Sequence, residues 1–332
     1  MNPWLQALLG VVLALVLMLV NGVVLIYMLR KVLAHLHVRL GPMEQGWHGT
    51  LQTMWDVLKL LSKEDITPSG VDKALYYIAP AIVFVPSLAA YGAIAFSRTW
   101  SIADSPNGLL YTFAVLSLVP LGILAAGWAS NNKWSLIGGM RAVAQQITYE
   151  VPLLLSALPV VLLARSMNLT DIVNAQSGLW FVVPMFPAFV MFAISALIEL
   201  NQTPFDMSEA ESELVAGFAT EYSSMKFGLL FLSEFSNTFI MSAVLVTLFL
   251  GGWRIPLLPY EWYAPLAPLV FVLKTYIVIF VFMWIRGTMP RVRIDQMMAF
   301  GWKILLPASL GWLMLTGLFV KLGQLAVKAA GS

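Results

Sequence analysis

The sequence predicts an all-α integral membrane protein with about eight transmembrane helices and one amphipathic interfacial helix. Hydrophobic residues make up 60% of the 332 residues and charged residues only 11%, whereas a soluble domain has about 25% charged residues. The charges are unevenly spread, so that uncharged runs long enough to cross a bilayer alternate with short charged segments. Barrel strands are about 10 residues long and alternate in polarity, so runs of this length indicate helices.

The predicted spans are runs that carry at most one charged residue. The first span is placed at about residues 4–29, and its apolar run starts without a basic segment or cleavage site, which favours a retained span over a signal peptide. The other runs are residues 74–97, 105–132, 142–164, 172–198, 227–253, 262–285 and 304–320, the last extended by snorkelling of its flanking lysines. We interpret residues 1–332 as a single membrane domain.

The distribution of Lys and Arg predicts the orientation. Basic residues concentrate in the loops after the first, third, fifth and seventh spans, which places those loops in the cytoplasm. They include an acidic loop at about residues 200–225 and a basic loop at about residues 286–303. With eight spans, both termini then face outside.

Residues 50–63 differ from a span. Apolar side chains recur there at helical spacing and polar side chains occupy the opposite face. The apolar set is Leu51, Met54, Trp55, Leu58 and Leu61, and the polar set is Gln52, Asp56, Lys59 and Lys63. This pattern predicts an amphipathic helix that lies in the membrane interface or against a partner.

The chain has no Cys, which excludes thiolate-bound iron–sulfur clusters within it. His35 and His37 are two residues apart and diverge on a helix, so we interpret them as interface residues and expect no metal site. No phosphate-binding loop, dinucleotide fingerprint or nucleophile elbow is present in the sequence. We expect no nucleic-acid partner.

Three charged residues lie inside apolar runs: Glu150, Glu234 and Lys274. Each costs about 2.5–3.5 kcal/mol at mid-membrane on insertion scales. One interpretation is that each snorkels to a nearby interface or forms a structural pair. The other is a series of buried ionisable groups that set one another's protonation and relay protons.

Acidic residues concentrate between Glu199 and Glu234. Seven of the seventeen acids lie there, namely Glu199, Asp206, Glu209, Glu211, Glu213, Glu221 and Glu234. If the segment is helical, Glu209, Glu213 and Glu221 share one stripe and Glu211 lies off it. A solvated acidic loop is the alternative, but the interleaved Phe205, Phe218 and Tyr222 favour packing against other helices or a ligand.

The loop with Arg286, Arg291 and Arg293 also has two interpretations. It is either the positive-inside signal alone or a counter-charge for the acidic segment or an anionic partner. A tight loop around Gly138-Gly139 would bring Arg141 and Glu150 under the acidic segment.

Five sequence blocks together resemble a known family. They are Arg39-Leu-Gly-Pro42; Leu51-Gln-Thr-Met-Trp-Asp-Val-Leu-Lys59 with Lys63-Glu64; Gly127-Trp-Ala-Ser-Asn-Asn-Lys133 through Arg141 to Glu150; Pro204 through Tyr222; and Arg286 through Gln296 with Gly301-Trp-Lys303. In order and spacing they resemble the quinone-channel membrane subunit family of respiratory complex I, the H subunits of bacterial NADH:quinone oxidoreductase. The acidic block is the most specific of the five.

The resemblance implies that the chain walls a quinone tunnel and couples quinone reduction to proton translocation. The residues implied for the tunnel are Arg30, Trp55, Asp56, Phe205, Asp206, Phe227 and Arg286. Those implied for proton coupling are Glu150, Glu199, Glu209, Glu211, Glu213, Glu221, Glu234 and Lys274. Arg141, Arg291 and Arg293 are implied as counter-charges of the loops, and no residue of this chain is implied to be catalytic.

The resemblance also implies the surroundings of the chain. Quinone is the bound substrate, and FMN and iron–sulfur clusters belong to partner subunits of a proton-translocating enzyme. The partners are hydrophilic iron–sulfur and quinone-site subunits, antiporter-like membrane subunits and the lipid of a bacterial inner membrane. Leu29, Thr53 and Gln202 depart from the family's Glu, Pro and Arg at those places. A related membrane-bound hydrogenase or formate hydrogenlyase anchor, and a free-standing secondary transporter, are the alternatives.

Overall fold

A computed structural model describes residues 3–98, 100–208, 211–256 and 258–330, and within these ranges the fold is all-helical, as predicted. The apolar helices of the bundle are α1 (Pro3–Leu36), α3 (Lys73–Ala93), α4 (Gly108–Leu116), α5 (Val119–Ala129), α6 (Lys133–Ala164), α8 (Phe186–Glu199), α10 (Ser224–Phe249), α11 (Ala267–Thr288) and α13 (Leu306–Ala330). The other helices are α2 (Gln52–Ser62), α7 (Leu169–Ala175), α9 (Glu211–Leu214) and α12 (Ile294–Phe300).

Seven helical segments of the described chain are long and apolar enough to cross a membrane. The difference from the predicted eight lies in residues 172–198, which are divided between α7 and α8. Pro184 cannot continue a helix, and the intervening chain turns because the Gln176 side chain accepts from the Phe181 N–H and donates to the Thr247 carbonyl. The 14 residues of α8 span only about 21 Å, less than the hydrocarbon core.

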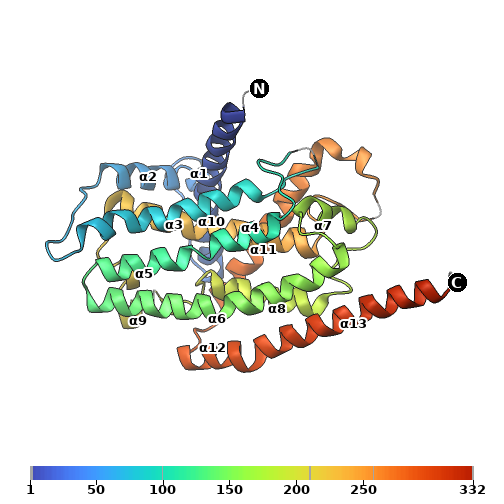
Figure 1. The fold of residues 1–332 in the computed structure, drawn as a ribbon. Coiled ribbons are helices and arrows are strands. Elements are labelled where there is room, and N and C mark those ends of the chain that lie inside the picture. Colours follow the sequence, from blue (N-terminus) through green and yellow to red (C-terminus); the bar gives the residue numbers. More distant parts are fainter. Residues whose placement is uncertain (1–2, 99, 209–210, 257, 331–332) are drawn as a thin grey trace.

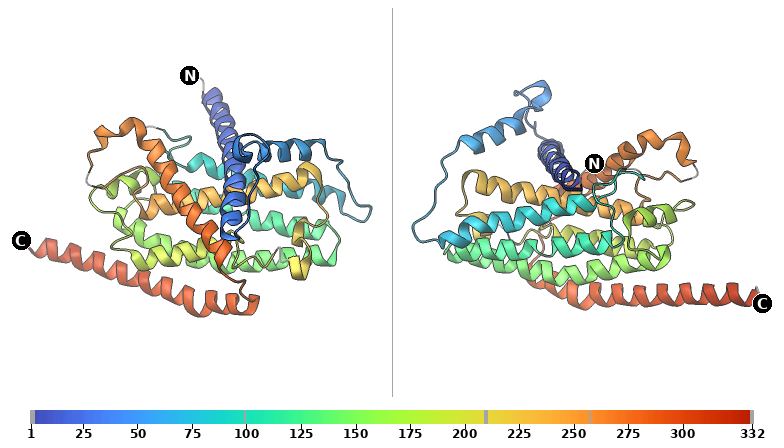
Figure 2. Two further views of the ribbon diagram at one scale, coloured as in Figure 1. Left: turned by 180° about the vertical axis from the view of Figure 1, so that it is seen from behind. Right: turned by 45° about the horizontal axis from the view of Figure 1, so that its top comes forward.

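The helices α3, α5, α6 and α8 lie roughly side by side, and α12 and α13 run along the outside of this group beside α6 (Figure 1). On the other side of the molecule, α1 and α11 cross the group at a steep angle (Figure 2). The helix α10 contacts α3 of this group as well as α1 and α11, and most of its residues are buried. We therefore regard α10 as the central helix of the bundle.

The amphipathic helix predicted at residues 50–63 is confirmed as α2, which packs against α1 and α10. Its apolar residues Leu51, Met54, Trp55 and Leu58 are exposed on the outside of the chain, whereas Thr53 is buried. That lipid or a partner covers this apolar face stays a prediction.

The acidic loop does not form the continuous helix that the stripe of Glu209, Glu213 and Glu221 required. From Leu214 onward the chain leaves the helix, because Val215 has a φ of 64° and Gly217 a φ of 56°. Gly217 also approaches α6 closely, since a Cβ atom on Gly138 would lie 2.8 Å from its Cα. Glu209 lies outside the described residues, and the backbone of Glu211 belongs to α9.

Candidate functional site

A cavity of about 220 Å³ lies where α3, α5, α6, α8 and α10 meet the acidic loop. Polar and aromatic side chains face each other across it. The polar set is Gln146, Glu199, Asn201, Glu234 and Asn237, and the aromatic set is Phe218, Phe227 and Phe231. Two carboxylates from different helices therefore share one largely enclosed space, an arrangement typical of functional sites in membranes.

On one side of the cavity, α6 contributes Gln146, and Glu150 follows one helical turn later without lining the cavity. The Gln146 amide donates a hydrogen bond of 3.3 Å to the backbone carbonyl of Glu199 at the end of α8. The Glu150 carboxylate lies close enough to act electrostatically on Glu199. The Oε2 atom of Glu199 is enclosed, and no described residue donates a hydrogen bond to it. A bound proton or a polar ligand would reduce the repulsion between the Glu150 and Glu199 carboxylates in this enclosed space.

On the other side of the cavity, α10 presents Glu234, whose Oε1 atom lies 3.7 Å from an Arg286 guanidinium nitrogen on α11. Asp206 of the acidic loop also acts electrostatically on Glu234, and it pairs with Arg291 at 3.2 Å. Two of the three predicted basic-loop arginines therefore serve as counter-charges to predicted acidic residues. The third, Arg293, lies beside them in a charged surface cleft of about 340 Å³.

The acidic loop is tied to α6 by Arg141, which donates to the Glu213 carboxylate at 2.5 Å. The hydrogen bond and positive charge of Arg141 lower the pKa of Glu213, with a smaller contribution from Arg291. Arg141 thus meets the acidic segment, as expected, but the expected loop at Gly138-Gly139 is wrong. Both glycines lie inside α6, and the lack of a side chain at Gly138 lets Gly217 of the acidic loop approach the helix. Glu213 itself is exposed, so solvent screens the pair.

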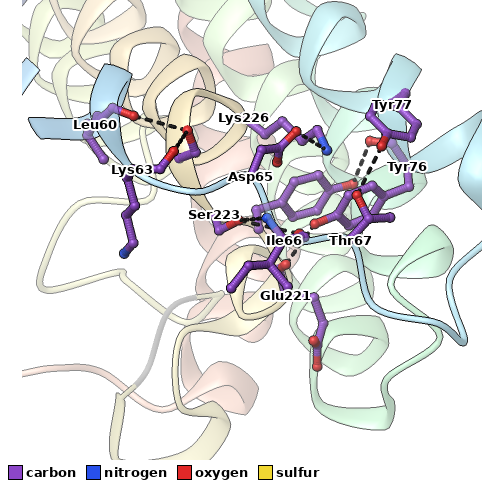
Figure 3. A network of polar contacts seen from close by, with 12 residues as sticks. Leu60, Lys63, Asp65, Ile66, Thr67, Tyr76, Tyr77, Glu221, Ser223 and Lys226 are labelled. Atoms are coloured by element: carbon purple, nitrogen blue, oxygen red, sulfur yellow. Dashed lines mark hydrogen bonds and ion pairs between the residues drawn. The ribbon is translucent and has the colours of Figure 1, made fainter. Parts of the chain in front are cut away.

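A second polar network joins the segment between α2 and α3 to the start of α10 (Figure 3). Lys226 lies 2.9 Å from the Asp65 carboxylate and 3.9 Å from the ring centre of Tyr77, a cation–π distance. Ser224 donates to the carbonyls of Leu60 and Lys63 at the end of α2. These contacts attach the amphipathic helix to the central helix.

The same network reaches Glu221 in the acidic loop. The Tyr76 hydroxyl donates to the Glu221 carbonyl at 2.7 Å, and Asn132 donates to the Glu221 carboxylate at 2.7 Å. Tyr222 stacks on Tyr76 with ring centres 4.4 Å apart, and burial raises the pKa of Tyr222 well above its usual value. Glu221 is therefore held by α3 and by the loop before α6, away from Glu213.

The residues expected at the tunnel lie in separate parts of the structure. Arg30 of α1 pairs with Asp56 of α2, and Trp55 is exposed beside them on the outer face of α2. Phe227 and Arg286 lie at the central cavity, since Phe227 lines it and Arg286 faces Glu234. Phe205 instead lines a separate apolar cleft beside α12.

Lys274 lies far from the predicted row of acidic residues. Its ammonium donates to the carbonyls of Leu250, Gly252 and Arg254 at 2.8, 2.9 and 2.6 Å, and it lies 4.5 Å from the Trp180 ring centre. Glu234 precedes Leu250 by sixteen residues of α10, which is about 24 Å along the helix. The structure therefore does not bring Lys274 together with the acidic row.

Two buried amides near the site were not singled out from the sequence as functional. Gln145 is fully buried and donates to the carbonyls of Ile198 and Phe205, so it fixes the end of α8 against the acidic loop. Gln202, one of the departures from the family, is buried and donates to the Thr238 hydroxyl of α10. A polar residue inside an apolar run was the available signal for Gln145.

Comparison with known proteins places the chain in a family. A sequence model of the family described as NADH dehydrogenase matches residues 9–317. The chain belongs to this family. It is 46% identical over 299 residues to the H subunit of NADH-quinone oxidoreductase from Rhodospirillum rubrum, covering 89% of this chain and 88% of the relative. It is 51% identical over 288 residues to the same subunit from Geobacillus kaustophilus, covering 86% of each.

Proposed function

We propose that the chain is the membrane subunit of an NADH:quinone oxidoreductase that walls the quinone tunnel and couples quinone reduction to proton translocation. The relatives are named as subunits of that enzyme over nearly their full length, which favours it over the hydrogenase alternative. Hydrophilic iron–sulfur subunits and antiporter-like membrane subunits would be its partners. Electrons would reach the quinone from those partners, because this chain has no Cys to hold a cluster.

Four neighbouring helices would line the quinone path in this function. The helices α1 and α10 each contact α2 and α11, and the four bear Arg30, Trp55, Asp56, Phe227 and Arg286. The exposed apolar face of α2 would meet the lipid from which an apolar quinone arrives. Phe227, at the start of α10, would lie between that face and the carboxylates of the cavity.

The central cavity would serve proton transfer, and it is the single observation on which the proposal most depends. A quinone that takes two electrons also takes two protons. Glu199 and Glu234 could exchange protons through the shared cavity, with Glu150 next to Glu199. Arg286 and Arg291 would bias the acids nearest to them, since an adjacent cation favours the ionised carboxylate. We also propose proton-coupling roles for Glu211, Glu213 and Glu221.

The substitution Glu234→Gln in the assembled complex tests this function. We expect coupled NADH:quinone activity and proton pumping in proteoliposomes to fall by about tenfold or more, because a proton-transfer group is lost. Glu261→Gln, at an exposed acid outside the cavity, is the matched control and should behave as wild type. Unchanged pumping in an assembled Glu234→Gln complex would contradict the role of the cavity. Co-purification with a nickel–iron subunit, without quinone reductase activity, would instead support the hydrogenase alternative.

A further inference from the structure

A second hollow lies outside the polar cavity, between α8 and α12, and we call it the α8–α12 cleft. Its volume is about 580 Å³, within the range of small-molecule sites. The lining is apolar except for two side chains, Gln296 and Lys303. The complete set is Ile194, Phe205, Val292, Gln296, Met297, Ala299, Phe300, Lys303 and Ile304.

Specific contacts fix the walls of the cleft. The Val292 N–H donates to the Pro204 carbonyl at 3.0 Å, which joins the basic loop to the acidic loop. The Tyr149 hydroxyl of α6 donates to the Met297 carbonyl of α12. Gly301 allows close docking on α6, because a Cβ atom there would lie 2.8 Å from a Thr148 methyl group. The cleft is therefore preformed.

The position of Lys303 indicates how deep the cleft lies in the membrane. Lys303 and Lys321 bracket the uncharged run 304–320, which is about 26 Å long as a helix and close to the thickness of the hydrocarbon core. Trp302, which is 54% exposed, lies at the same level, as expected for an aromatic residue at the membrane interface. This spacing places Lys303 at headgroup level, the depth of the lipid phosphates.

The backbone at Lys303 is also unusual. Residues Gly301–Leu305 form a π-helical turn between α12 and α13, and such turns occur frequently at functional sites. Lys303 is exposed, and no ion pair joins it to an acid of the described residues. An apolar cleft with an exposed cation at headgroup level is complementary to a molecule with an apolar chain and an anionic head.

We propose that the α8–α12 cleft binds one anionic phospholipid, with an acyl chain against Phe205 and Phe300 and the phosphate on Lys303. Basic pockets between transmembrane helices bind such headgroups in other membrane proteins. Because Phe205 and the Val292–Pro204 contact belong to the cleft wall, the lipid would brace the acidic loop from outside. This inference does not depend on the proposed function.

Photolabelling of the purified whole complex tests the site. The probes are phosphatidylglycerol and phosphatidylcholine, each with a photoreactive acyl chain, and the readout is the labelled fraction of the peptide containing residues 292–304. We expect preferential labelling by phosphatidylglycerol. Lys303→Gln should lower it by about fivefold, the factor that corresponds to the loss of one lysine's attraction to anionic lipid. Ala299→Phe, which fills the cleft and keeps the lysine, should lower it for both probes.

Lys321→Gln is the matched control, because Lys321 lies at the far end of the same apolar run, and it should leave labelling of the peptide unchanged. Equal labelling by the two probes, or no effect of Lys303→Gln, would overturn the proposal. So would a carbodiimide cross-link from Lys303 to a carboxylate of another subunit, since a protein would then occupy the cleft.

Discussion

Lys274 and the carboxylates of the polar cavity were predicted as members of one row, but the protein surrounds them differently. Three backbone carbonyls satisfy all three donors of Lys274, and the Trp180 ring covers its ammonium. Glu199 has an enclosed oxygen atom without a donor among the described residues, and Glu234 faces an arginine at 3.7 Å. The Lys274 ammonium therefore has an acceptor for every donor, whereas the Glu199 and Glu234 carboxylates have fewer partners than they can bind.

The difference separates a charge with a full set of fixed partners from charges without one. The carbonyls around Lys274 follow the last turn of α10, where Gly251 and Gly252 adopt positive φ angles of 70° and 53°. A cation at a helix C-terminus stabilises the last carbonyls, so we interpret Lys274 as a cap of the central helix. The cavity acids lack such a set of fixed partners and can respond to a nearby charge.

The largest effect on stability is expected for Lys274→Met, because this substitution leaves three backbone carbonyls without their hydrogen-bond donor. We expect the free energy of unfolding to fall by about 3 kcal/mol, measured as a lower melting temperature of the purified complex. Lys321→Met, at an exposed lysine, is the control. If Lys274→Met abolishes proton pumping at unchanged stability, then Lys274 belongs to the proton pathway and the contrast with the cavity acids is wrong.

An intermediate effect is expected for Lys226→Gln, because Lys226 is held by a carboxylate and two rings instead of by backbone groups. We expect a loss of about 1–2 kcal/mol, typical of a partly buried charged hydrogen bond with a cation–π contact. Hydrogen exchange should speed up in residues 63–72 and 221–226 together. Lys59→Gln, at an exposed lysine of α2, is the control, and faster exchange in only one segment would contradict the network.

The smallest effect on stability is expected for Glu213→Gln, because Glu213 is exposed to solvent. Arg141 lowers the folded-state pKa of Glu213 below its ordinary value of 4.5. Stabilisation by this pair is therefore complete above that value and is lost as the pH falls through the lowered pKa. At pH 7 we expect Glu213→Gln to cost less than about 1 kcal/mol. Melting curves of both proteins should converge below about pH 4.5, and a constant difference would contradict the assigned cause.

The sequence predicted the fold class and most elements because each depends on local hydrophobic periodicity. The all-helical membrane architecture and the amphipathic helix followed from the lengths and spacing of apolar runs. The difference at residues 172–198 also has a local cause. An uncharged run of this length predicts one span, but Pro184 and the hydrogen bonds of Gln176 divide it into α7 and α8.

The candidate site was predicted less completely. Charged residues inside apolar runs identified Glu150 and Glu234, and acid clustering identified the loop. The helical stripe of acids was wrong because the chain turns at Val215 and Gly217 to pack on α6, and such packing depends on a distant segment. The pairing of Asp206 with Arg291 joins residues 85 positions apart, which no periodicity encodes.

By itself, then, the sequence determined that this protein lies in a membrane, where most of its helices run and which residues are costly to bury, since transfer from water depends mainly on residue type. Only the tertiary structure decided which of those charges meet. It joined Glu199 and Glu234 at one cavity and bound Lys274 to the carbonyl of Leu250, which lies about 24 Å along α10 from Glu234. The physical reason is that a charge is stabilised by the particular dipoles and ions within a few ångströms, and these come from segments far apart in the chain.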